Sequence, residues 1–184
     1  MTDTINHGGQ RTFGWLRWVG WGGAAALVIL PLMAMRFAPD SGVNWTAGDF
    51  VFAALMFGAV GLAAETAVRI SRSWAYRGGA ALGLAAGFLL VWSNGAVGYI
   101  GDDNPYNIVF FAIVALAFVG SVLVRFRAKG MALTMLAAGI AHTIAGAIGF
   151  PQDPVTGPIT IVFTGMWLAS AALFHKAAEE EATA

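Results

Sequence analysis

The chain has 184 residues, of which 58% are hydrophobic and 11% charged, and its mean hydropathy is +0.71. Because a soluble domain carries about 25% charged residues, this composition excludes a water-covered globule and predicts a membrane protein. The ten basic and ten acidic residues cancel, and no basic cluster of the nucleic-acid-binding type is present, so we expect no nucleic-acid partner. The chain has no cysteine, which excludes disulfides and thiolate metal sites.

Six apolar runs lie along the chain, each close to the ~20 residues that a helix needs to cross a bilayer. They predict helices over 18–35, 47–70, 74–99, 107–124, 130–149 and 158–174, with tails over about 1–12 and 176–184. Thr46 and Asp49 resemble a capping box at the start of the second helix, with Asp where Glu or Gln is usual. We therefore expect one all-α domain over residues 1–184, a polytopic membrane bundle of six transmembrane helices.

The basic residues predict how this bundle is oriented. All of them except Arg36 fall at alternate ends of the six runs. Since Lys and Arg are retained on the cytoplasmic side, both termini should be cytoplasmic and the loop around residues 102–107 should lie outside.

That outer loop belongs to a polar stretch, 94–107, flanked by long apolar runs. At a rise of about 1.5 Å per residue, Asn94 and His142 differ by about 8 Å in height, too far for a direct hydrogen bond unless the helices tilt. Because tilts of about 20° are normal and a water could bridge the remainder, we expect a small polar cavity open to the outside. The candidate cavity residues are Asn94, Asp102, Asp103, Asn104, Asn107 and His142. The alternatives are separately satisfied polar groups, a solvated loop or a cation-binding turn at Asp102–Asn107, and a proton-transfer, quinone or haem role for His142.

Glu65 is the candidate ionisable residue inside a membrane helix. It precedes Arg69 by four residues, a spacing that favours a helical ion pair. The alternative is a proton or cation site.

Small residues mark the expected helix contacts, because they let membrane helices approach closely. On the third helix they are Gly79, Gly83 and Gly87, and on the fifth Ala137, Ala141, Ala145 and Gly149. A third stripe comprises Ala54, Gly58 and Gly61, with Glu65 on the same face.

No catalytic motif is present, neither His-Glu-x-x-His nor a phosphate-binding glycine loop nor a nucleophile elbow. We therefore expect no catalytic residue, no metal ligand and no cofactor. Three hypotheses remain for the function. The first is a membrane protein without enzymatic activity, acting as an accessory or interaction subunit in the bilayer with a membrane-protein partner or a second copy of itself. The second is a small transporter or channel for protons or a small solute, and the third is a membrane enzyme or redox protein.

Three segments support a resemblance. They are Trp92-Ser-Asn94-Gly-Ala-Val-Gly98, Gly101-Asp-Asp-Asn104-Pro-Tyr-Asn107, and Arg125-Phe-Arg127 with Gly130-Met-Ala. Together with the regions around 45–50 and Glu65, they resemble a family of small bacterial inner-membrane proteins of unassigned function. The resemblance implies a multi-pass protein of the bacterial inner membrane and supplies neither an activity nor a cofactor.

Overall fold

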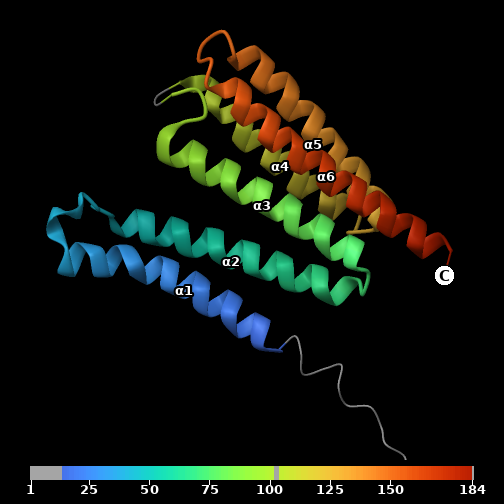
Figure 1. The fold of residues 1–184 in the computed structure, drawn as a ribbon, viewed down its shortest axis with the longest axis horizontal. Coiled ribbons are helices and arrows are strands. Elements are labelled where there is room, and N and C mark those ends of the chain that lie inside the picture. The colour runs from blue at the N-terminus through green and yellow to red at the C-terminus, as the bar shows by residue number, and fades with distance from the viewer. Residues whose placement is uncertain (1–13, 102–103, 184) are drawn as a thin grey trace, which may run out of the picture. The chain divides into compact units, whose positions relative to one another are not determined.

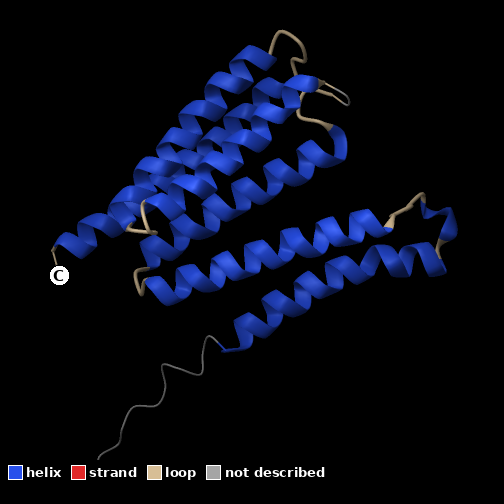
Figure 2. Ribbon diagram, turned by 180° about the vertical axis from the view of Figure 1, so that it is seen from behind, coloured by secondary structure: helices blue, strands red, loops and turns tan. Residues whose placement is uncertain are grey.

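The computed structural model describes residues 14–101 and 104–183, and their secondary structure is helical (Figure 2). The α-helices are α1 (Gly14–Phe37), α2 (Ala47–Ile70), α3 (Trp74–Val97), α4 (Ile108–Leu123), α5 (Ala128–Gly149) and α6 (Thr156–Ala182). Two short 3-10 helices, η1 (Pro39–Ser41) and η2 (Pro105–Asn107), lie in the α1–α2 and α3–α4 loops. Six helical segments, counted over the described residues, are long and apolar enough to cross a membrane. The predicted fold class is confirmed.

The predicted helix ends hold for α2, which begins and ends as expected. They differ most for α6 and for α1, which begins at Gly14 and not at Trp18, and less for α3. The third helix ends at Val97 and not at Tyr99. The sixth continues past Phe174 to Ala182, because a hydropathy pattern marks only the part of a helix that suits lipid. Beyond that part, His175 lies 3.5 Å from Glu179 at the favourable i,i+4 spacing.

The predicted capping box at the start of α2 is present. The Thr46 N–H and hydroxyl both donate to Asp49 Oδ2, at 2.7 and 2.9 Å, and the Asp49 N–H points back to Thr46 Oγ1 at 3.4 Å. This reciprocal arrangement satisfies backbone donors that a helix start otherwise leaves unpaired.

The contacts divide the chain, for which we expected one domain, into two compact units, Met1–Leu62 and Ala63–Ala184. The first unit holds α1 and most of α2, where the Trp21 ring covers Gly61 and Ala53 is fully buried. In the second unit, α6 packs most extensively on α5 and then on α3, and α4 packs on both α5 and α3 (Figure 1). The largest fully buried side chains of its core include Trp167, Phe110 and Phe174.

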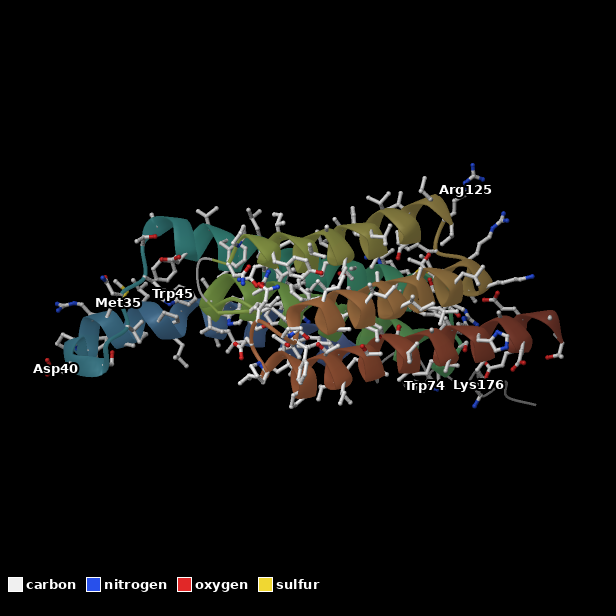
Figure 3. All side chains as sticks on the ribbon, turned by 90° about the horizontal axis from the view of Figure 1, so that it is seen from above. Met35, Asp40, Trp45, Trp74, Arg125 and Lys176 are labelled. Carbon is white, nitrogen blue, oxygen red and sulfur yellow. The ribbon has the colours of Figure 1, made fainter. Side chains whose placement is uncertain are left out.

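Within the second unit, the basic residues gather at one end. Figure 3 shows Trp74 at the start of α3, Arg125 in the α4–α5 turn and Lys176 on α6 at the same end of these helices. The predicted topology requires this arrangement. The side of the membrane that this end faces stays a prediction.

Candidate functional site

The candidate site begins where α3 stops. Gly98 has φ +69°, a conformation that favours glycine, and a Cβ at this position would collide with the Gly101 carbonyl and with Asn107 Nδ2. Its N–H donates to the Asn94 carbonyl at 3.2 Å and closes the last turn. The helix therefore ends at Val97, and Tyr99 leaves the helical path to become buried, with 5% of its surface exposed.

Two asparagines hold the loop that follows. Asn94 accepts the Tyr99 N–H at 2.9 Å through Oδ1 and donates through Nδ2 to the Asn107 carbonyl at 2.8 Å. Asn107 accepts the Ile100 N–H at 2.9 Å through Oδ1 and donates through Nδ2 to the Gly101 carbonyl at 2.8 Å. Backbone groups that a buried loop would leave unpaired are thus satisfied by amide side chains.

Tyr99, His142 and Thr160 form a buried polar cluster, which we call the Tyr99 cluster. The Tyr99 hydroxyl lies 3.0 Å from His142 Nε2 and 3.0 Å from Thr160 Oγ1. It connects the α3–α4 loop to α5 and α6. Burial raises the pKa of the Tyr99 phenol above its usual range, and the hydrogen bond with Thr160 opposes that shift. The phenol therefore stays neutral at physiological pH and serves as a hydrogen-bonding hydroxyl.

Aromatic rings surround the Tyr99 cluster. The Tyr99 ring stacks on Phe110 of α4 with centroids 3.8 Å apart. Phe110 also lies edge-on to His142 at 5.6 Å, and Phe163 of α6 approaches His142 at 5.5 Å. His142 is fully buried.

Gly146 explains how α6 comes close enough to complete the cluster. A Cβ on Gly146 would collide with the side chain of Thr160, so α5 and α6 reach this distance only because the position carries no side chain. One turn away, the hydroxyls of Thr143 and Thr164 meet at 2.9 Å across the same pair of helices.

The structure corrects the expectation of a polar cavity between Asn94 and His142. Tyr99 bridges them, with its N–H on Asn94 and its hydroxyl on His142, so a packed side chain lies where we expected open space. The physical reason is the early end of α3 at Gly98, which turns Tyr99 into the bundle. Asn107 joins Asn94 in holding the loop backbone.

The other loop residues have separate places. Asn104 accepts the Tyr106 N–H at 3.0 Å and donates to Gln152 at 3.1 Å, joining the α3–α4 and α5–α6 loops. Asp102 and Asp103 lie outside the described residues. Within the described ranges, 14–101 and 104–183, no group of three His, Asp or Glu side chains is placed to hold a metal ion.

Two buried nitrogens in the described part of the bundle have no hydrogen-bond partner, His142 Nδ1 and Trp167 Nε1. Trp167 is 1% exposed. An unpaired buried polar atom costs about 1–3 kcal/mol. Of these two atoms, His142 Nδ1 belongs to the Tyr99 cluster, and the surrounding fold leaves it unpaired.

Glu65 pairs with Arg69 at 2.5 Å. The Glu65 side chain is 19% exposed and that of Arg69 71% exposed. The pair lies within the last two turns of α2 and is separate from the Tyr99 cluster.

The glycines of α3 lie against other helices. A Cβ on Gly79 would stand 3.0 Å from the Phe174 ring, and one on Gly83 would stand 3.1 Å from both Met135 Sδ and Ser170 Oγ. Gly87 has looser neighbours on α4 and α6, at 3.6 and 3.8 Å. The Ser170 hydroxyl donates to the Gly79 carbonyl at 2.7 Å, which ties α6 to α3.

On α5 three of the four small residues of the expected stripe face the bundle. Ala145 and Gly149 are buried and Ala141 is partly buried, whereas Ala137 is exposed. Gly139 and Gly146 make the close approaches to α6.

No family model, curated protein or solved structure matches this chain. The resemblance to small bacterial inner-membrane proteins therefore stays a prediction, and the interpretation of the site rests on its geometry.

Sequence reasoning missed Tyr99 and Thr160. The signal for Tyr99 was present in Gly98-Tyr-Ile-Gly101, since glycine is the residue that most often ends a helix. Read in that way, Gly98 closes α3 and releases the aromatic residue that follows. Thr160 had no local signal, because its role depends on Gly146 of a different helix.

Proposed function

We propose that this chain is a protein of the bacterial inner membrane without enzymatic activity, which acts as an accessory or interaction subunit of another membrane protein. The observation that carries the proposal is that polar side chains in the bundle bind other parts of the same fold. Asn94 and Asn107 bind loop backbone, and Tyr99 joins that loop to His142 and Thr160. Polar side chains that form contacts within the fold are typical of a structural subunit.

The first unit supports an interaction role. Among described residues 18–62, Pro31 and Ala53 are the buried side chains. Gly20 and Gly23 have no atom of this unit within 4 Å of where a Cβ would stand. Since small residues promote helix association in lipid, this face of α1 suits a partner helix.

Photo-crosslinking in the native membrane tests the proposal. A photoreactive residue at Leu27, which follows Gly20 and Gly23 on one face of α1, should give a discrete crosslink to another protein. Val119 of α4 is the matched control, because the two side chains are 54% and 50% exposed. A product of twice the chain mass would identify a second copy as the partner. Lipid adducts alone at both positions would contradict an accessory role.

A transporter for protons or a small solute is the second candidate, favoured by the unpaired Nδ1 of fully buried His142. Ionisable groups inside membranes often serve transport. Proteoliposomes separate the two functions. A transporter predicts a proton or solute flux that His142→Gln abolishes, whereas an accessory subunit predicts no flux above that of protein-free liposomes.

A further inference from the structure

A hollow of about 550 Å³ lies at the α4–α5 turn, away from the Tyr99 cluster. Three exposed cations line it, Arg125, Arg127 and Lys129. Leu123 and Leu133 line its apolar side and are 75% and 61% exposed. The hollow therefore joins a positively charged rim to an apolar wall.

The backbone of this turn is held in an unusual shape. Arg125 and Phe126 have φ values of +53° and +57°, two successive non-glycine residues in the left-handed region, which costs about 1–2 kcal/mol for each. Three hydrogen bonds hold them there, the first from the Arg125 N–H to the Val122 carbonyl at 2.9 Å. The Phe126 N–H donates to the Ser121 carbonyl at 3.0 Å, and the hydroxyl of buried Tyr76 donates to the Phe126 carbonyl at 2.7 Å.

A strained backbone that its surroundings fix in place is a recurrent property of functional sites. In this turn, the Arg125 side chain points away from the helices at the end of the bundle (Figure 3). Gly130 completes the hollow, because its missing side chain lets the start of α5 lie against Val124.

The charged residues that line the hollow are all basic. Among the described residues, no carboxylate pairs with Arg125, Arg127 or Lys129. The first turn of α5 contains no acidic residue, and no side chain caps it, so its backbone N–H groups add the positive end of the helix dipole. Such a site attracts a phosphate.

The apolar wall decides which phosphate fits. Leu123 ends one candidate membrane span, and Leu133 lies near the start of the next. A soluble phosphate would leave both leucines uncovered, whereas a phospholipid places its acyl chains beside them.

We infer that the α4–α5 hollow binds one anionic phospholipid, with the headgroup phosphate against Arg125, Arg127 and Lys129 and an acyl chain along Leu123 and Leu133. Basic pockets between membrane helices bind anionic headgroups by this chemistry. The inference depends on the membrane-spanning fold and is independent of the accessory role.

Native mass spectrometry of the full chain with phosphatidylglycerol or phosphatidylcholine tests the inference. The wild type should bind phosphatidylglycerol more tightly. Arg125→Gln/Lys129→Gln should weaken that binding by roughly 25-fold, from about 5-fold for each cation removed near a membrane surface, and should weaken phosphatidylcholine binding less, because choline balances the charge of its phosphate. The matched control is Arg72→Gln/Lys176→Gln, which removes two exposed cations that do not line the hollow.

Two results would overturn the site. The first is equal binding of the two lipids by the wild type, and the second is an equal loss of phosphatidylglycerol in both double variants. If glycerol 3-phosphate, which has no acyl chain, bound as tightly as phosphatidylglycerol, the apolar half of the inference would be wrong.

Discussion

The α1–α2 hairpin, up to Leu62, and the bundle of α3–α6 are both built from apolar helices that can cross a membrane, yet they are held together differently. In the most apolar window of α1, 6% of the residues are buried, and in that of α2, 11%, compared with 44% in α5 and 33% in α6. The difference teaches that hydropathy decides whether a helix resides in lipid and says little about what it packs against.

In the bundle, helices pack closely where a glycine has no side chain and where polar side chains meet. Gly83 leaves space for Ser170 and Met135, and Gly146 leaves space for Thr160. The hairpin has comparable glycines, but Gly22 and Gly58 have no atom of their own unit within 4 Å of where a Cβ would stand. Substitutions at paired positions therefore test whether the two regions really differ.

The largest expected effect is that of Gly83→Leu. Its side chain would enter the space of Ser170 and Met135, and overpacking of this kind costs about 3 kcal/mol. We expect a clear fall in the thermal unfolding temperature in detergent. Gly58→Leu in the hairpin is the control and should change stability by less than about 0.5 kcal/mol. If the two variants had the same unfolding temperature, the bundle and the hairpin would not differ in packing at these glycines.

Gly98→Ala should cost roughly 2–3 kcal/mol, because alanine at positive φ is strained and its Cβ would collide with the Gly101 carbonyl. Gly42→Ala is the control for the backbone part of this cost, because it places alanine at positive φ without a collision. Gly42 has φ +74° with no atom within 4 Å of a Cβ, so its substitution should cost only about 1 kcal/mol. Chemical denaturation of both variants measures the difference, and similar losses would mean that the collision is relieved.

Asn94→Ala should destabilise the bundle by about 2 kcal/mol, because the Tyr99 N–H and the Asn107 carbonyl each lose a buried partner. Hydrogen exchange should show faster exchange at Tyr99 and Ile100. Asn44→Ala, at an exposed position before α2, should be close to neutral. Unchanged exchange at Tyr99 in the Asn94 variant would show that the loop is held by other contacts.

The smallest effect is expected for Asp49→Ala, which removes half of the capping box at the start of α2. Loss of a cap costs about 1 kcal/mol. The change should be local, so exchange should increase in the first turn of α2 and stay constant at His142. Faster exchange throughout the bundle would contradict a local effect.

The sequence predicted the helices well because each is defined by its own residues. The apolar run over 47–70 and the reciprocal Thr46–Asp49 cap are local features, and both are present as expected. The ends of α3 and α6 were less accurate. The predicted third helix continued through Gly98 to Tyr99, although the positive φ of Gly98 ends the helix, and the charged end of α6 is helical outside the apolar pattern.

The candidate site was predicted only in part. Asn94 and His142 were singled out as polar groups of one region, and Tyr99 does join them. The predicted void between Asn94 and His142 was wrong, because the side chain of Tyr99 from the intervening loop lies there. Such a contact depends on the path of the loop in three dimensions. No spacing of Asn94, Tyr99 and His142 along the chain encodes it.

The Tyr99 hydroxyl has one proton and two neighbours, His142 Nε2 and Thr160 Oγ1. If Nε2 carries the imidazole proton, it donates to Tyr99, Tyr99 donates to Thr160, and Nδ1 is a bare lone pair. If Nδ1 carries the proton, Tyr99 donates to Nε2 and Thr160 donates to Tyr99. The tautomer of one ring thus sets the direction of a hydrogen-bonded chain across α5, the loop and α6. The two states differ at Nδ1, a buried donor in one and a buried acceptor in the other, and the nitrogen chemical shifts of His142 distinguish them.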